Sequence, residues 1–435
     1  MTSVKTSQPT VTATGRPRVG LVLLLGAITI LGPLSIDLYL PAFPTIQHEL
    51  GASEASVQLT LTGFLVGLAL GQPISGPLSD AIGRRRPMLI GLTIYLAMSV
   101  LLAVSPSIEI LIGARFLQGV AGAFGVAVAM GMVRDLAAGA AAARLLSTMM
   151  LVTGLGPILA PMIGGQLLRL VDWRGVFWFL AVVALGLLAT AYFAIPETLP
   201  ADRRTTGGVR TALRSYRVLI TDRIYVGYAL TNGLMFGAVF GYIAAASFVY
   251  QGIYHLTPQA YGVAAGINAL GMVAMTQVNG RLVSYFAPRR LLIVGVVIAT
   301  LSGAVLLGIA TTRPSSVWWI AVPLFVMVAS IGLVMPNGMA MALNDYPKSA
   351  GTGAALMGAS QFVLGGAVTA LMGLGGSSTA IPMAGFIAGL TLLSLTAQLV
   401  LARPRSGRAA AARQRVLLRY EPATHESEVA AEARA

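Results

Sequence analysis

Twelve stretches of at least 18 mostly apolar residues recur along the chain, and they set the strongest limit on its fold. A helix needs about 20 apolar residues to cross the roughly 30 Å hydrocarbon core of a bilayer. The sequence therefore predicts an all-α membrane protein with twelve transmembrane helices. Short polar joints separate the stretches, which lie at 19–46, 56–79, 87–104, 108–133, 145–169, 174–195, 224–250, 259–283, 290–311, 316–343, 350–373 and 380–402.

The composition excludes most soluble classes of protein. The 435 residues are 56% hydrophobic and 10% charged, with a mean hydropathy of +0.80, a balance typical of bundled membrane helices. There is no cysteine, which excludes disulfides and thiolate metal sites. His48, His255 and His425 are not spaced as ligands, so we expect no metal and no cofactor. The segment Met1–Arg18 has no short apolar core with a cleavage site, so no removable signal peptide is expected.

The basic residues predict how the chain is oriented in the membrane. If the N-terminus is cytoplasmic, 25 of the 29 Lys and Arg residues fall on the cytoplasmic side. Only Arg169, Arg174 and Arg313 fall outside, and Arg115 lies within a span. This bias favours both termini in the cytoplasm and a multi-pass location in the cytoplasmic (inner) membrane. It also accounts for the net charge of +14 without nucleic acid as a partner, with attraction to anionic lipid as a second contribution.

A weak internal repeat divides the chain into two six-span halves. The joint 76–86 and the joint 280–290 share a Gly, a Leu and two final Arg at an offset of 204 residues. The longest internal polar joint lies between the halves and is rich in Pro, Gly and Arg, as expected of a linker. The predicted divisions are a cytoplasmic tail at 1–18, a six-helix bundle at 19–195, a cytoplasmic linker at 196–222, a second six-helix bundle at 223–402 and a cytoplasmic tail at 403–435.

Asp37 lies inside the first apolar stretch. A carboxylate at such a depth costs at least about 2.5 kcal/mol, so it should face protein or water rather than lipid. Gly32, Pro33, Pro41 and Pro44 interrupt the regular backbone on either side of it, which predicts a kinked, locally polar helix. An acid held by a buried partner for structure alone is the alternative.

Arg115, in the fourth stretch, shares the depth of Asp37. At about 1.5 Å per residue, each lies about 10 Å from the outer end of its helix. Two ions at one depth, with Gln118 a turn below Arg115, can satisfy one another. We therefore expect a proton-coupling centre at Asp37, Arg115 and Gln118, and a purely structural ion pair is the other interpretation.

Four motifs resemble those of the major facilitator superfamily, specifically its drug:proton antiporters with twelve spans. Within that group the chain is most similar to the Bcr/CflA branch, whose members export bicyclomycin, chloramphenicol and other antibacterials. The resemblance covers about residues 19–402, and its motifs are the joint 76–86, Arg-Phe-Leu-Gln-Gly at 115–119, the segment 156–165, and D-x-x-x-P-x-x-P from Asp37 to Pro44. In the third motif Ala160 stands where the family pattern G-x-x-x-G-P-x-x-G-G has Gly. The resemblance implies the major facilitator fold, with two pseudo-symmetric six-helix bundles around a central cavity.

The resemblance also implies roles for the first and third motifs. In the first, Asp80 would sit against the positive end of a helix of the other half, and an Arg would pair with Asp135. Such a conformational latch stabilises the outward-facing state, and a tight turn with orienting charge is the alternative. The latch residues are Gly76, Asp80, Gly83, Arg84, Arg85 and Asp135. The antiporter motif, whose small residues and prolines allow close approach and kinking, comprises Gly156, Pro157, Pro161, Gly164 and Gly165.

These features predict a proton-coupled antiporter that exports small drug-like or antibiotic molecules by alternating access. Asp37 would take up a proton with the cavity open outward, and release it when drug and water enter from inside. The partners of the protein would be a small-molecule drug, protons and the lipid bilayer. The proton gradient would supply the energy. A monomer is expected. Candidate residues for an adaptable, Met-rich cavity wall are Tyr39, Met149, Met150, Asn232, Met235, Phe236, Asn268 and Gln361.

Three other functions remain open from the sequence. The same fold could take up a small nutrient or metabolite together with protons. An intramembrane enzyme or lipid-handling protein would need a nucleophile–base or metal constellation, and the spans contain no His, no Cys and no paired carboxylates, so we expect no enzyme. A multispan sensor that transports nothing is the third.

Overall fold

The computed structural model describes residues 19–137, 139–204, 217, 219–346, 350–376 and 378–402. Within that part of the chain it has twelve helices long and apolar enough to cross a membrane, so the predicted all-α class and span count are confirmed. The predicted tails 1–18 and 403–435, and part of the predicted linker, lie outside the described residues. The spanning helices are α1 (Val19–Asp37), α3 (Glu54–Ile82), α4 (Arg85–Ala103), α5 (Ile108–Leu136), α6 (Gly139–Leu167), α7 (Trp173–Ala194), α9 (Arg223–Ser247), α10 (Pro258–Leu282), α11 (Pro288–Thr311), α12 (Trp318–Leu343), α13 (Ala350–Met372) and α14 (Ile381–Val400).

Side-chain caps begin several of these helices. The first N–H groups of a helix lack partners within it, and Asp, Ser or Thr at the preceding position can accept from them. Ser53 does so for α3, Asp172 for α7, Asp222 for α9 and Thr257 for α10, at donor–acceptor distances of 2.9 to 3.2 Å. At these four helices the residue just before the first turn therefore determines where the helix begins.

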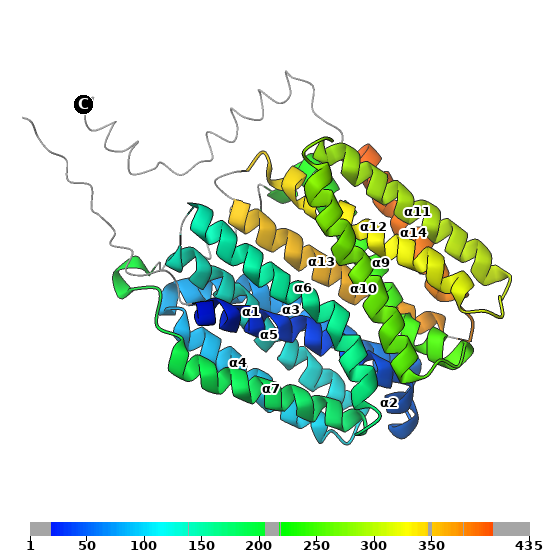
Figure 1. Cartoon of the computed structure of the whole chain (residues 1–435), viewed down its shortest axis with the longest axis horizontal. Helices are drawn as coiled ribbons and strands as arrows, with labels where there is room; N and C mark the ends of the chain where they lie inside the picture. The colour runs from blue at the N-terminus through cyan, green and yellow to red at the C-terminus, as the bar shows by residue number, and fades with distance from the viewer. Residues whose placement is uncertain are drawn as a thin grey trace, which may run out of the picture.

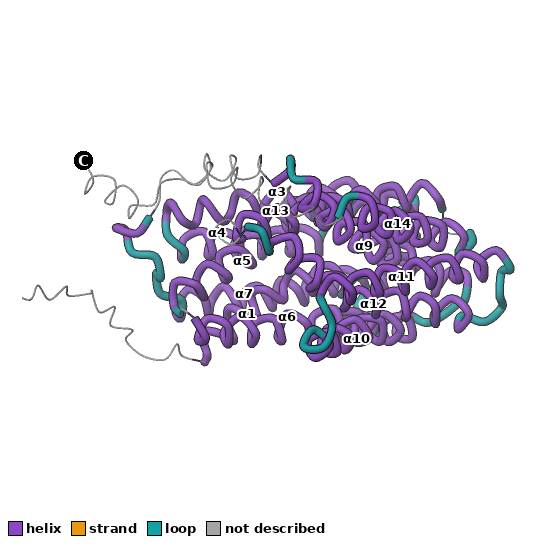
Figure 2. Tube along the Cα trace, turned by 90° about the horizontal axis from the view of Figure 1, so that it is seen from above, coloured by secondary structure: helices purple, strands orange, loops and turns teal. Residues whose placement is uncertain are grey.

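The helices form two groups that pack alike. Helices α1 and α3 to α7 make one bundle, and α9 to α14 make the second (Figure 1). The pairs α3–α5, α4–α5, α4–α7 and α1–α6 have counterparts in α10–α12, α11–α12, α11–α14 and α9–α13. The two bundles meet where α3 packs on α13 and α6 packs on α10, and Figure 2 shows them side by side along the long axis.

The first span is broken where its prolines predict a break. Helix α1 ends at Asp37, the 3₁₀ turn η1 spans Leu40–Ala42, and the short helix α2 spans Phe43–Glu49. Pro41 has no N–H to donate to the carbonyl of Asp37, so the regular helix cannot continue past that residue. The seventh span has a comparable irregularity, because α9 passes into the π-turn η3 (Phe248–Ile253).

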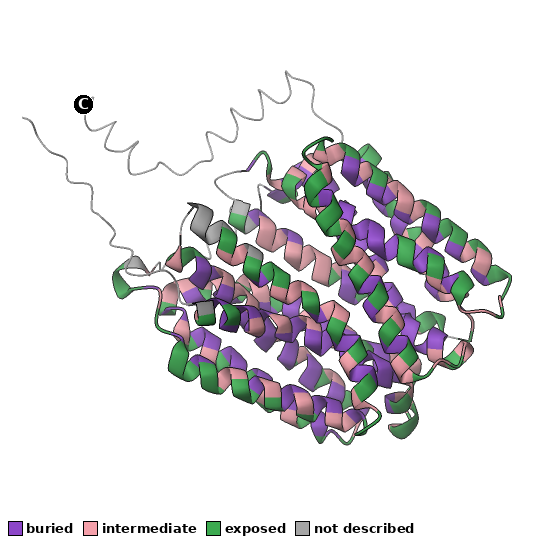
Figure 3. Cartoon of the chain, in the orientation of Figure 1, coloured by how far each residue is buried: buried purple, intermediate pink, exposed green. Residues whose placement is uncertain are grey.

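The helix ends and joints lie on two opposite faces of the molecule. The basic face carries the α3–α4 joint with Arg84 and the start of α9 at Arg223, and the opposite face carries α2 and η3. Between them, large apolar side chains point away from the bundle, as for Val182 and Phe193 of α7, which are 67% and 86% exposed. Exposed positions follow the outer sides of the helices (Figure 3), as expected of a surface covered by lipid.

Helices α3 and α5 cross with their backbones in contact. A Cβ atom on Gly67 would lie 2.2 Å from the carbonyl oxygen of Phe116, and one on Gly119 would lie 2.1 Å from that of Phe64. Small residues allow such an approach between membrane helices. The crossing holds Arg115 of α5 beside Phe64 of α3.

Candidate functional site

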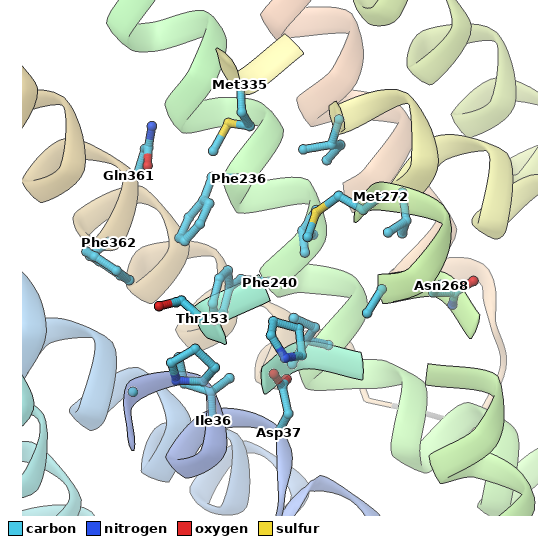
Figure 4. A pocket seen from close by; sticks show the side chains of 18 of the residues that line it. Ile36, Asp37, Thr153, Phe236, Phe240, Asn268, Met272, Met335, Gln361 and Phe362 are labelled. Carbon is cyan, nitrogen blue, oxygen red and sulfur yellow. The ribbon is translucent and has the colours of Figure 1, made fainter. Parts of the chain in front are cut away.

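A cavity of about 700 Å³ lies between the two bundles. This volume is within the range of small-molecule sites. Its wall is almost entirely apolar, and Asp37 is the one charged residue among the described residues that line it. Helices from both halves contribute, including α1, α3, α5 and α6 from the first and α9, α10, α12 and α13 from the second. Figure 4 shows the aromatic and methionine side chains that border the space.

Asp37 is placed in the cavity wall by the break in the first span. It is the last residue of α1, its side chain is 8% exposed, and Figure 4 shows its carboxylate directed into the space bordered by Phe236, Phe240 and Met272. A charged carboxylate here is expensive unless water or a cation reaches it. Among the described residues it makes no ion pair.

Two tyrosines of the second half, Tyr242 and Tyr261, share the cavity wall with Asp37. Tyr242 and Tyr261 both interact electrostatically with it. Tyr242 in turn accepts a 2.7 Å hydrogen bond from the amide of Asn268 on α10. The acid of the first half therefore faces a small polar group of the second half across the cavity.

Arg115 does not pair with Asp37, contrary to the expectation from their shared depth. Its guanidinium donates to the carbonyl of Ser35 at 2.8 Å and to Oε1 of Gln118 at 2.6 Å. It also lies over the rings of Tyr39 and Phe64, 4.5 and 4.3 Å from their centroids. The predicted depth is right, because Arg115 contacts the turn that carries Asp37. The expected ion pair is not formed, because the guanidinium binds the backbone carbonyl of Ser35 rather than the carboxylate of Asp37.

Replacing Arg115 with Ala should destabilise the protein strongly. The side chain is fully buried, so truncation leaves a void and removes both bonds, at a cost of about 3 kcal/mol or more. Lys keeps the charge but neither the planar stacking nor the double hydrogen bonding, so Arg115→Lys should lie in between. Thermal unfolding of the purified variants measures this, together with transport.

Arg174→Ala is the matched control, because Arg174 makes a partly exposed ion pair with Glu49 at 3.2 Å. Such pairs contribute about 1 kcal/mol or less. Equal losses of thermal stability in Arg115→Ala and Arg174→Ala would contradict the stabilising role assigned to Arg115.

Of the eight residues predicted for the cavity wall, the structure brings five to it. These are Met149, Met150, Phe236, Asn268 and Gln361. Three others are correct only in their span and approximate depth. Tyr39 is buried and hydrogen-bonded to Thr60. Asn232 is buried and donates to the carbonyl of Met335 in its own half, and Met235 is buried outside the cavity wall.

A charged cluster joins the helix ends at the basic face. The guanidinium of Arg84, only 6% exposed, contacts Asp80 at 2.5 Å and Asp135 at 2.9 Å and donates to the hydroxyl of Ser79. The predicted contact between an Arg and Asp135 is thus present. Asp80 pairs with Arg84 of its own half rather than with the other half, and no residue of the second half belongs to the described cluster.

Sequence reasoning missed Glu197, which completes this cluster. Its carboxylate accepts backbone N–H bonds from Arg84, Arg85 and Leu199 at 2.8 to 3.3 Å. Burial acts to raise the pKa of Glu197, but these N–H groups and Arg204 outweigh it and hold the pKa below its usual value. Thr198, the next residue, donates to Asp135 at 3.0 Å. An acid directly after Pro196, at the start of a joint rich in Arg, was the available signal.

Gly83 is required at this cluster for two reasons. Its φ of +97° suits glycine. A Cβ atom there would also lie 2.4 Å from Oε2 of Glu197. By contrast, a Cβ on Gly76, another predicted latch residue, would meet nothing within 4 Å, so close packing does not explain a glycine there.

The segment 156–165 packs α6 against both α1 and α10. A Cβ on Gly156 would lie 2.7 Å from the ring of Pro33, and one on Gly164 would lie 1.8 Å from the carbonyl oxygen of Leu38. A Cβ on Gly165 would lie 2.7 Å from the carbonyl oxygen of Pro258 in the other half. Pro157 and Pro161 line the cavity. This motif therefore sets how closely the residue after Asp37 and the second half approach α6.

Comparison with known proteins agrees with this architecture. Residues 25–370 match the family model of the Major Facilitator Superfamily. A Bacillus subtilis protein called an uncharacterized MFS-type transporter, YdgK, is 37% identical over 372 residues, covering 85% of this chain and 92% of the relative. A bicyclomycin resistance protein homolog of Haemophilus influenzae is 30% identical over 376 residues, covering 86% and 94%.

Solved structures show the same fold at low sequence identity. The crystal structure of a D-xylose–proton symporter superposes with a TM-score of 0.70 at 15% identity, covering 89% of this chain and 98% of that one. The twelve spans and the two-bundle packing thus have the fold of these structures. The family match and the Bacillus subtilis relative show more: the chain belongs to the major facilitator superfamily, a family of transporters.

Proposed function

We propose that the protein is a proton-coupled antiporter that exports small drug-like or antibiotic molecules, of the chloramphenicol or bicyclomycin class, across the cytoplasmic membrane. The observation that carries this proposal is the largely apolar cavity of about 700 Å³ with one carboxylate, Asp37, in its wall. An apolar wall with aromatic and Met side chains suits varied lipophilic molecules. The name of the Haemophilus influenzae relative, a bicyclomycin resistance protein homolog, supports this substrate class.

In the proposed orientation the basic face and both termini are cytoplasmic. The distribution of Lys and Arg supports this, with 25 of 29 on that side. The hydrogen bonds found between described residues of the two halves lie toward the opposite face, at Leu40, Pro41, Gly165 and the Thr62–Thr369 pair. The conformation is then closed to the outside, with substrate reaching the cavity from the cytoplasm.

The proposed cycle uses Asp37 as the site of exchange. Open to the outside, the cavity admits a proton to the carboxylate. Open to the cytoplasm, the cavity admits water and drug, which stabilise the ionised acid and let the proton leave. A potential of about 100 mV supplies about 2.3 kcal/mol per charge, enough for one proton to sustain roughly a 50-fold drug gradient.

Within this proposal Arg115 and Gln118 are positioning residues. Arg115 binds the turn before Asp37 through the carbonyl of Ser35 and so fixes the end of α1. Gln118 accepts a hydrogen bond from the Arg115 guanidinium and so holds Arg115 in place. The basic-face residues Asp80, Arg84 and Asp135 hold α3 and α5 together, and the latch role stays a proposal for the outward-facing state.

Everted membrane vesicles with an acid interior test the proposed direction of transport. Adding chloramphenicol, bicyclomycin or a lipophilic cationic dye should let protons leave the lumen, which raises the signal of a luminal pH dye, while drug accumulates inside. Vesicles carrying Asp37→Asn should show neither change. Proton-driven accumulation of the compound by intact cells would reverse the assignment to uptake, and no movement of any compound would favour a sensor.

A further inference from the structure

Three neutral side chains of the second half bind backbone carbonyls of the first half at the opposite face. The hydroxyl of Ser247 donates to the carbonyl of Leu40 at 2.6 Å. The amide of Gln251 donates to the carbonyl of Pro41 at 3.1 Å. The amide of Gln259 donates to the carbonyl of Gly165 at 2.8 Å. Every acceptor is main chain of the first half, and every donor is a side chain of the second.

The acceptors lie where the first half interrupts its own helices. Pro44 has no N–H with which to continue the helical bond to Leu40, so the carbonyl of Leu40 accepts from Phe43 in a 3₁₀ turn and from Ser247. Gly165 lies in the last turn of α6, where carbonyls lack helical partners. The prolines that follow Asp37 thus present carbonyls to the other half.

The donors are held by the irregular end of the seventh span. Ser247 is fully buried at the end of α9, and its hydroxyl accepts a second bond from the amide of Gln251 at 2.8 Å. Gln251 lies within the π-turn η3, and π-turns within helices occur often at functional sites. One amide nitrogen therefore links Ser247 to the carbonyl of Pro41.

We infer that Ser247, Gln251 and Gln259 form a gate that holds the opposite face closed while the cavity is open at the basic face. Leu40 and Pro41 follow Asp37 within four residues. A change at Asp37 that moves the segment after α1 therefore moves two of the three acceptors. The gate thereby couples Asp37 to closure of the opposite face, although none of the three gate side chains is charged. This inference concerns the conformational cycle and holds whatever the cargo and the direction of transport.

Distances between spin labels test the gate without a substrate. The chain has no cysteine, so pairs can be introduced in the full-length protein at exposed positions, His48→Cys with Ser315→Cys on the opposite face and Arg144→Cys with Ser284→Cys on the basic face. Each pair is labelled and measured by double electron–electron resonance in liposomes, first alone and then with Ser247→Ala, Gln251→Leu or Gln259→Leu.

Each gate variant should lengthen distances at the opposite face and shorten them at the basic face. One neutral hydrogen bond changes an equilibrium by roughly threefold to tenfold, so the ratio of open to closed populations should rise by that factor. Removing two bonds should multiply the effects, by roughly 10- to 100-fold.

Two matched controls separate gating from general disturbance. Ser360→Ala removes a hydroxyl that bonds only its own helix, to Met357, and Gln166→Leu removes an exposed amide at the same end of α6. Both should leave the distance distributions unchanged. If the gate variants match these controls, the inference is wrong. If the distances shift but no drug moves in vesicles, the gate stands and the proposed export fails.

Discussion

Asp37→Asn is expected to abolish proton-coupled transport, by at least about 100-fold, while the protein still folds. The side chain of Asn has nearly the same shape and volume as that of Asp, so packing at the end of α1 is retained. It cannot ionise, however, and in the part of the cavity wall that the structure describes Asp37 is the one charged residue. A side chain that neither takes up nor releases a proton cannot exchange a proton for drug. The measurement is drug-driven proton release from everted vesicles.

The same variant should retain drug binding and downhill drug exchange. These steps need the cavity but no net proton movement, so their survival separates loss of coupling from loss of the site. Asp172→Asn is the matched control, because Asp172 caps α7 outside the cavity and Asn caps a helix as well as Asp does. Undiminished proton release in Asp37→Asn would remove Asp37 from the mechanism.

Gly164→Ala is expected to impair both stability and transport, because it acts on the packing of the backbone beside Asp37. A Cβ at this position would lie 1.8 Å from the carbonyl oxygen of Leu38, and backbone cannot turn away as a flexible side chain can. Overpacking of this kind costs about 1–3 kcal/mol and occasionally more. Since Leu38 follows Asp37, relief of the clash would also displace the carboxylate. Thermal unfolding and vesicle transport measure the two effects.

Gly154→Ala on the same helix provides the comparison. A Cβ there would meet nothing within 4 Å, and Ala favours a helix over Gly by about 0.5–1 kcal/mol. Gly154→Ala should therefore be neutral or slightly stabilising. If Gly164→Ala behaves in the same way, α1 and α6 do not pack as closely as the structure has them.

The break after Asp37 was predictable because its cause is local. Pro41 and Pro44 remove backbone donors wherever they stand in a membrane helix, and the structure has the end of α1 and the turn η1 at that point. A contact between an Arg of the first motif and Asp135 was expected, and the structure has Arg84 in that place. The part played by Glu197 was not expected, because two of its partners, the backbone N–H groups of Arg84 and Arg85, are more than 100 residues away.

The expected pairing of Asp37 with Arg115, which the structure does not have, shows what an argument from depth alone leaves undetermined. Counting residues along two spans gives the height of each side chain, and Arg115 does contact the turn before Asp37. Height does not give the direction in which a side chain points, which depends on how each helix is rotated against its neighbours. For the same reason Tyr39, Asn232 and Met235 are buried within their own halves rather than in the cavity wall.

By itself the sequence determined the number of spans, the broken first helix and the depth of each buried charge, because bilayer thickness, helix rise and proline chemistry act on neighbouring residues. Only the tertiary structure decided which faces meet across the cavity and which carbonyls receive Ser247, Gln251 and Gln259. Those contacts join residues up to 210 positions apart, and their geometry follows from the packing of the two bundles rather than from any local pattern.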